Sequence, residues 1–432
     1  MQPKSKHKIT TLTGIAIVVA NMIGTGAFTS LGFQLKDLNN PSVVLTLWVL
    51  GGILALSGAF SYAEVGTVIS KSGGEYAFLS KIYNPLIGYL SGWISLTVGF
   101  AAPIALAAIA FSEYFPFGNF NVKWMSIALV AVITLIHTRS LKLSAEFQNI
   151  STLLKVILIV IIISIGLVLP EHSGNDIVSS KGYFTELTST AFAIALIYVS
   201  YSYSGWNAAA YITEEFENPL KSLPKALIGG TILVTVLYAL LQYVFLKHVP
   251  VDYLAGQLNV GTIATQQMLG EKLGNFFGLA ISLLLISGIS AMVWVGPRVT
   301  SSIAKEHRLW SYFQTQENGI PKRALWLQFS ISALLLLTGT FEQIMIYCGI
   351  LLTASSLMTV LGVFKLRKQN QQRIGFKSPL FPLFQIVFVL LSVWMITYAL
   401  IHNPFETILG MSNLLIGTGT YFWSEKIKKS NY

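Results

Sequence analysis

Charge is scarce in this sequence, and its scarcity excludes most soluble protein classes. Only 11% of the 432 residues are Asp, Glu, Lys or Arg, whereas 53% are hydrophobic. Soluble domains carry about 25% charged residues. The few charges here cluster between long apolar runs, each near the roughly 20 residues that cross a bilayer as a helix. The sequence therefore predicts an all-α membrane protein with several spans.

Cysteine and the common catalytic motifs are lacking as well. The single cysteine, Cys348, lies inside an apolar run, which excludes a disulfide within the chain. We interpret it as a small buried hydrophobe. No two histidines stand at metal-ligand spacing, and no GxSxG, HExxH, CxxC or P-loop motif occurs. These absences argue against a hydrolase, a metalloenzyme or an ATP-driven pump, so we expect no catalytic residue, no metal and no cofactor.

The positive charge of the chain is distributed in a way that argues against nucleic acid binding. The formal charge is +10, but the basic residues stand in short loops on alternate sides of the apolar runs, without interleaved aromatics. Lys4, Lys6 and Lys8 precede the first apolar run, as in a signal peptide. Glycines interrupt that run and no small-residue cleavage site follows, so we interpret it as a retained first span.

Twelve apolar segments can be drawn as membrane spans. They run near 9–35, 41–66, 84–112, 122–138, 146–169, 187–213, 224–246, 273–298, 324–340, 342–364, 380–402 and 404–424. With the N-terminus inside, 22 of the 28 Lys and Arg residues fall in cytoplasmic loops and 5 outside, and Lys155 lies within a span. Because cytoplasmic loops are enriched in Lys and Arg, this split predicts both termini in the cytoplasm and a location in the cell membrane.

Two of the predicted spans contain helix-breaking sequences. The first carries Gly24-Thr25-Gly26, and each glycine destabilises a helix by roughly 1 kcal/mol relative to alanine. The sixth repeats the device with several hydroxyls before Gly205. Broken helices at matching positions of two five-span halves are typical of inverted-repeat transporters with a site at the repeat interface.

The first break offers chemistry suited to an amino acid. Unwound backbone leaves amides that hydrocarbon cannot satisfy, and a helix that begins after Gly26 directs its positive dipole end at an anion such as a carboxylate. Carbonyls at the end of the preceding half-helix can accept hydrogen bonds from an ammonium group. The alternative is that these glycines only allow close helix packing. The second break favours the binding site, and we expect Gly26→Val to abolish binding.

A lysine lies deep inside the fifth predicted span. Lys155 is about ten residues into it, which at about 1.5 Å per residue is roughly 15 Å, near the bilayer midplane. A charge there is a functional hypothesis by default. Burial disfavours the charged form, which suits proton exchange, whereas a permanent ammonium suits the place where related carriers bind sodium. The alternative is snorkelling toward the cytoplasm.

The acidic residues favour a neutral substrate. Glu64 is expected to end the second span, and Glu214, Glu215 and Glu217 the sixth; we predict helix-end contacts for these and for Arg298. No Asp or Glu is expected at mid-depth near either break. A cationic side chain would therefore lack a partner.

Ordered motifs along the whole chain resemble those of the amino acid–polyamine–organocation transporter superfamily. The segment 22–28 (MIGTGAF) looks like its first break, and 61–66 (SYAEVG) with 72–76 (SGGEY) like its second-span end. Residues 205–224 contain its GWN, EE, NP and LP pairs, and 378–382 (SPLFP) its eleventh-span start. The GWN form is most similar to the L-type neutral amino acid exchangers and their bacterial relatives.

The resemblance implies roles for particular residues. Gly24, Thr25 and Gly26 would bind the carboxylate, carbonyls of Met22, Tyr201 and Ser204 would meet the amine, and Tyr201 would be an aromatic gate. The neighbouring positions complete the implied substrate site: Ile23, Ser202 and Gly205. Lys155 would occupy a sodium-site position, with Ser287 or Ser290 lining it. Asn21 and Ser204 stand where smaller residues are usual, which favours a small or medium substrate.

The fold implied is a five-plus-five inverted repeat of twelve transmembrane helices, with the first and sixth helices broken. Residues 1–170 would form the first repeat, 187–364 the second, and 378–432 two appended, peripheral helices with a cytoplasmic C-terminus. We expect a sodium-independent secondary carrier of neutral amino acids, by exchange or proton symport. Polyamine or cationic amino acid transport, an amino acid sensor without turnover, and a membrane enzyme are the alternatives. Without a cysteine suited to a linked accessory subunit, the chain is expected to work alone in the bilayer.

Overall fold

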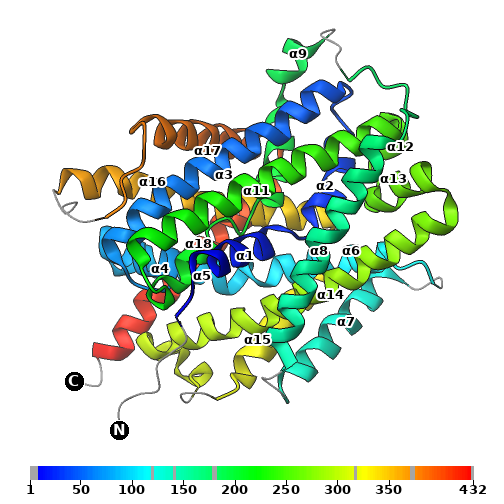
Figure 1. Ribbon diagram of the computed structural model, residues 1–432. Coiled ribbons are helices and arrows are strands. Elements are labelled where there is room, and N and C mark those ends of the chain that lie inside the picture. The colour runs from blue at the N-terminus through cyan, green and yellow to red at the C-terminus, as the bar shows by residue number, and fades with distance from the viewer. Residues whose placement is uncertain are drawn as a thin grey trace.

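The computed structural model describes residues 8–117, 121–139, 143–177, 182–315, 319–369 and 375–429. Within these residues the chain is built of helices, and the only β-pairing is a parallel bridge between Ile9 and Phe216. Five of the basic residues used to predict the orientation lie outside the described residues: Lys4, Lys6, Lys142, Lys181 and Arg373. The described chain begins, and helix α18 ends, at the same end of the molecule (Figure 1).

The first and sixth predicted spans are both interrupted. The first consists of α1 (Thr11–Met22) and α2 (Gly26–Gln34), which meet at an angle of 41°. The sixth consists of α10 (Thr190–Ser202), an irregular turn, and the 3₁₀ helix η2 (Ala208–Glu215). The two predicted breaks are therefore confirmed as breaks in the helices.

Continuous helices occupy the other ten predicted ranges, with one of them passing through a π-helical turn. They are α3 (Pro41–Ile69), α5 (Pro85–Ile94) with η1 (Ser95–Gly99) and α6 (Ala101–Tyr114), α7 (Val122–His137), α8 (Leu143–Val168), α11 (Pro219–His248), α14 (Glu271–Glu306), α15 (Lys322–Thr338), α16 (Phe341–Lys368), α17 (Leu383–His402) and α18 (Pro404–Lys429). Shorter helices lie in the connections: α4 (Gly74–Ile82), α9 (Tyr183–Leu187), α12 (Val251–Leu254), α13 (Val260–Leu269) and η3 (Arg308–Phe313).

Several of these helices are long and apolar enough to cross a membrane. Among the described residues there are seven, or eight when the bent pair α1–α2 is taken as one span. Two further apolar helices, α7 and α10, are shorter. A multi-pass, all-helical membrane protein is thus confirmed. The total of twelve spans, the inverted repeat and the cytoplasmic orientation stay predictions.

Asn-Pro pairs begin four of the helices, α3, α5, α11 and α18, and in the first three the asparagine side chain caps the helix. Asn40, Asn84 and Asn218 each accept a hydrogen bond from a first-turn amide through the side chain, and proline follows each of them. Proline is favoured there because the first-turn N–H has no partner within the helix, and the asparagine oxygen satisfies a neighbouring amide. The NP motif that supports the family resemblance is therefore a helix-start signal.

Small residues let the central helices approach one another. A Cβ on Gly230 of α11 would lie 2.7 Å from Val18 of α1, and one on Gly52 of α3 would lie 2.2 Å from Thr235 of α11. Contacts of this kind replace the hydrophobic drive that is lost when the surroundings are lipid. They place α11 between α1 and α3 (Figure 1).

Two predictions about charged residues at helix ends are wrong. Helix α3 continues to Ile69, so Glu64 lies inside it, fully buried, and both of its oxygens accept 2.7 Å hydrogen bonds from Arg367 of α16. Helix α14 continues to Glu306, so Arg298 lies within the helix. In both cases packing against neighbouring helices extends the helix beyond its most apolar segment.

Candidate functional site

The two breaks lie directly against each other. Gly205 follows α10 with φ +98°, a conformation that favours glycine. A Cβ on Gly205 would lie 2.7 Å from the backbone carbonyl of Asn21, near the end of α1. The second break therefore requires glycine at position 205 for two reasons. Its backbone conformation favours glycine, and a side chain there would clash with the first break.

The first break presents amides that have no backbone acceptor. Within the described part of the chain, the backbone N–H groups of Gly24, Thr25 and Gly26 donate to no backbone carbonyl, and the Gly24 N–H faces the Tyr238 hydroxyl. The Thr25 carbonyl accepts bonds from the amides of Phe28 and Thr29, in the first turn of α2. Free donors at the positive end of a helix can bind a carboxylate.

The glycines on either side of Thr25 have different surroundings. A Cβ on Gly24 would have only the Met22 carbonyl near it, at 4.0 Å. A Cβ on Gly26 would lie 2.5 Å from the Cα of Ser202, so Gly26 permits α2 to pack on α10. The close-packing interpretation therefore applies to Gly26 and not to Gly24, and Gly26→Val alters packing as well as the amides.

Two of the backbone carbonyls predicted to bind the substrate amine already accept hydrogen bonds from the protein. The Met22 carbonyl accepts a 2.6 Å bond from the Tyr238 hydroxyl, and the Tyr201 carbonyl accepts the Ser204 amide at 2.9 Å. A carbonyl has two lone pairs, so the Met22 carbonyl can accept one more donor. The Tyr203 amide also faces the Tyr201 carbonyl. Ile23 is buried in the apolar core.

Ser202 lies in the contact between α10 and α2. Its hydroxyl donates to the Tyr198 carbonyl at 2.8 Å and lies 2.9 Å from the Ser30 hydroxyl of α2. The sequence did not predict this contact, because Ser30 and Ser202 are far apart along the chain.

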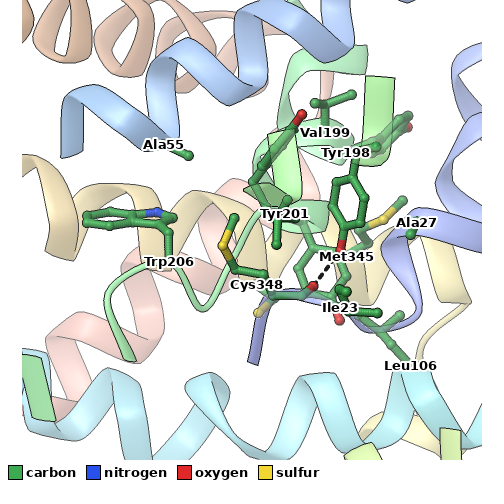
Figure 2. Close-up of a cluster of buried hydrophobic side chains, with 14 of the residues drawn as sticks. Ile23, Ala27, Ala55, Leu106, Tyr198, Val199, Tyr201, Trp206, Met345 and Cys348 are labelled. Carbon is green, nitrogen blue, oxygen red and sulfur yellow. Dashed lines mark hydrogen bonds between the residues drawn. The ribbon is translucent and has the colours of Figure 1, made fainter. Parts of the chain in front are cut away.

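Tyr201 lies between the first break and a large cavity. The ring is buried, its hydroxyl lies next to the Thr25 side chain, and the residue contributes to the cavity wall. Figure 2 shows Tyr201 in a cluster with Ile23 from the break and Cys348 from α16. Cys348 is buried, as predicted.

The cavity has a volume of about 1240 Å³. Its wall includes Asn21, Ser204 and Gly205 beside the breaks, and it extends to Ile9 and Glu215. Those two residues are joined by a 2.8 Å hydrogen bond between the Ile9 amide and the Glu215 carbonyl. The segment Gly24–Gly26 is not part of the wall, so Tyr201 separates its amides from the cavity.

An acidic residue lines this cavity, contrary to the sequence-based prediction. Glu75 of α4 is buried, and its carboxylate accepts hydrogen bonds from the hydroxyls of Tyr62 and Tyr211 and from the Asn207 amide. The prediction was wrong because α4 was treated as a loop between spans. Helix α4 instead packs against η2, which begins three residues after Gly205. The motif 72–76, which contains Glu75, was the feature of the sequence that could have indicated this residue.

Comparison with known proteins identifies the family. A model of the amino acid permease family matches residues 9–420. The chain belongs to the amino acid permease family. The chain is 28% identical to the b(0,+)-type amino acid transporter 1 of Mus musculus over 441 residues, which cover 97% of this chain and 89% of the relative.

Two further relatives cover nearly the whole permease. The cystine/glutamate transporter of Homo sapiens is 26% identical over 443 residues, which cover 98% of this chain and 86% of the relative. The large neutral amino acids transporter small subunit 2 of Mus musculus is 27% identical over 450 residues, which cover 99% of this chain and 83% of the relative. These relatives are transporters, so the permease is not an enzyme.

In this permease the predicted coupling residues Lys155, Ser287 and Ser290 lie on the facing helices α8 and α14. Lys155 of α8 is buried, and a Cβ on Gly288 of α14 would lie 3.6 Å from its ammonium nitrogen. Ser287 donates to the Leu284 carbonyl of its own helix, and the Ser290 hydroxyl lies 2.8 Å from a ring nitrogen of His137. Among the described side chains no carboxylate pairs with Lys155. The lysine therefore faces the glycine between the two predicted serines.

Proposed function

We propose that this permease is a secondary active carrier of neutral L-amino acids that works by alternating access. The observation that carries the proposal is the set of amides at Gly24–Gly26 that donate to no backbone carbonyl, beside the second break, where Gly205 lies against Asn21. An amino acid supplies the carboxylate that these amides lack. No covalent step is needed, because differential binding to two conformations is sufficient for transport.

The substrate would be held by its backbone groups. Its carboxylate would accept from the amides of Gly24, Thr25 and Gly26, and its ammonium group would donate to the carbonyls of Met22, Tyr201 and Ser204. Tyr201 would cover the bound substrate on the cavity side. Asn21 and Ser204 take up space beside the breaks, which supports a small or medium side chain.

Lys155 supports coupling without sodium. Its ammonium group occupies the interface of α8 and α14 beside Gly288, where it would replace a bound cation. Loss of its proton would leave the same interface uncharged. We propose exchange or proton symport on this basis.

We further propose that the permease needs no disulfide-linked accessory subunit and resides in the cell membrane with both termini in the cytoplasm. Its one cysteine, Cys348, has no exposed surface. An intermolecular disulfide would require the core to open. Co-purification under non-reducing conditions tests this: a covalent partner released by a reductant would contradict it.

Glu75 supports a second candidate, the transport of cationic amino acids. It is a buried carboxylate on the cavity wall, with hydrogen bonds but no described cationic partner. Glu75→Gln separates the candidates by competition between lysine and leucine. Loss of lysine uptake with leucine uptake retained would favour the second candidate.

Uptake of radiolabelled amino acids into proteoliposomes tests the function. We expect flux that is unchanged when sodium is replaced by potassium. Flux that requires internal amino acid indicates exchange, and flux driven by a proton gradient alone indicates symport. Binding without flux under either condition would overturn the carrier in favour of a sensor. A thermal-shift screen against the twenty amino acids identifies the side chain.

A further inference from the structure

Helix α14 carries two side chains on the cavity wall with hydrogen-bond donors that no described acceptor uses. Trp294 and Arg298 are one helical turn apart, so their side chains are neighbours. The indole N–H of Trp294 is buried and has no partner within the described structure. The guanidinium of Arg298 lies 4.0 Å from the centre of the Trp294 ring, and Nη1 donates to the Trp294 carbonyl. One of its five N–H donors is thus used within the helix.

The charge of Arg298 is not neutralised by the described protein groups. The ion pairs between described residues are Lys36–Glu342 and Arg367–Glu64, and neither involves Arg298. Glu75 is the buried acidic residue on the same wall, and three other donors already bond to its carboxylate. A partly buried cation without a counter-charge is costly. A buried N–H without an acceptor is a sign of a missing ligand, ion or water.

The geometry also restricts what can bind. Stacking on the indole ring holds the guanidinium plane in one orientation, and a planar guanidinium matches the two oxygens of a carboxylate. The indole N–H is a donor only, so it adds to anion binding and contributes nothing to an ammonium group.

We propose that Trp294 and Arg298 form a carboxylate-binding subsite in the cavity, separate from the amides at Gly24–Gly26. Its ligand is a carboxylate anion, either that of the transported amino acid after it has passed Tyr201 or that of a free small carboxylate. The first of these sources rests on the proposed transport function. The second does not, which makes the two separable by experiment.

The first experiment uses propionate, which has a carboxylate and no amino group. Propionate is expected to raise the midpoint of thermal unfolding of the purified permease in detergent, whereas chloride at equal ionic strength and propylamine are not. Arg298→Met should reduce the shift and leave only the part that comes from propionate bound at the amides of Gly24–Gly26. Trp294→Phe keeps the ring under the guanidinium and removes only the N–H, so it should weaken propionate binding about tenfold. An equal shift in wild type and both variants, or none in wild type, overturns the proposal.

The second experiment assigns the source of the carboxylate. In oriented proteoliposomes, Arg298→Lys and Trp294→Phe should raise KM for the amino acid about tenfold at the face onto which the cavity opens, and change it less than twofold at the other. A role in folding alone would change both faces or neither. A propionate effect with unchanged KM assigns the subsite to a free carboxylate. If the wild type shows no amino acid flux, the transport function fails, and the propionate experiment still decides on the subsite.

Discussion

At the scale of single residues, two glycines separated by one position have different physical roles. Gly24 has open space where a side chain would be, whereas Gly26 touches the backbone of Ser202. In the sequence the two are equivalent, because local composition shows only that the helix is weak there. The tertiary contact with α10 distinguishes them.

The two alanine variants should therefore fail in different ways. Gly24→Ala should keep the stability of the wild type and weaken amino acid binding tenfold or more, because the methyl group enters the space before the free amides. Gly26→Ala should lower the free energy of unfolding by about 1–3 kcal/mol, because it overpacks the α2–α10 contact. Thermal unfolding and equilibrium binding of a radiolabelled amino acid measure the two effects. Normal affinity in Gly24→Ala would argue against the carboxylate site.

Lys155 is a second residue whose role depends on burial. Its side chain is 4% exposed, so the ammonium group does not reach water by snorkelling. That observation removes the simplest alternative to a functional role.

Lys155→Ala should change the pH dependence or the turnover of transport. The charge beside Gly288 is then absent at every pH, so the profile of initial uptake rate between about pH 5 and 8 should lose one titration step. Lys221→Ala, an exposed lysine at the start of α11, is the control and should match wild type. A variant at position 155 with the wild-type profile would remove Lys155 from the mechanism.

At the scale of elements, a buried ion pair fastens α3 to α16. Glu64 has no exposed side-chain surface, and it also accepts the Ser378 amide at 2.8 Å. The segment that begins α17 is thus attached to the same carboxylate. The motifs 61–66 and 378–382, which the sequence presents as separate signals, meet at this residue.

Removal of one partner of the Glu64–Arg367 ion pair should lower the stability of the protein more than removal of both. Arg367→Met leaves a buried carboxylate without its counter-charge and should lower stability by about 3–5 kcal/mol. The double variant with Glu64→Gln should recover much of that loss. Lys36→Met breaks the exposed pair with Glu342 and should cost less than about 1 kcal/mol. Midpoints of thermal unfolding in detergent compare the four proteins. Equal losses in the single and double Arg367 variants would contradict this account.

At the scale of the whole molecule, the cavity reaches one end and the other end is closed. Beyond the breaks, Lys36 and the Tyr198 hydroxyl both bind the carboxylate of Glu342, at 2.7 and 2.5 Å. Phe33 stacks on Phe341 beside them, with ring centres 5.4 Å apart. None of these residues lines the cavity. These contacts, which we call the closure, join α2 and α10 to the start of α16. Helices α2 and α10 are the half-helices that extend from the two breaks away from the cavity.

A cysteine placed in the cavity should therefore react from one side only. In oriented vesicles, a membrane-impermeant thiol reagent should label Ser204→Cys from the side that carries Ile9, and Cys348 of the wild type, which is buried, should stay unlabelled. Glu342→Gln weakens the closure and should increase labelling from the opposite side several-fold, since an exposed pair contributes up to about 1 kcal/mol. Equal labelling of Ser204→Cys from both sides would contradict the one-sided cavity.

The sequence by itself determined the class of protein, the approximate positions of its long helices and the positions of both breaks. These follow from local properties: apolar length set by the bilayer, and glycines that weaken a helix. Tertiary structure alone decided which groups meet across those helices. It placed Gly205 against Asn21, Glu75 in the cavity, Arg367 on Glu64, and Arg298 inside α14 beside Trp294. Contacts between segments far apart along the chain depend on helix packing, and packing leaves no periodic signal in a single sequence.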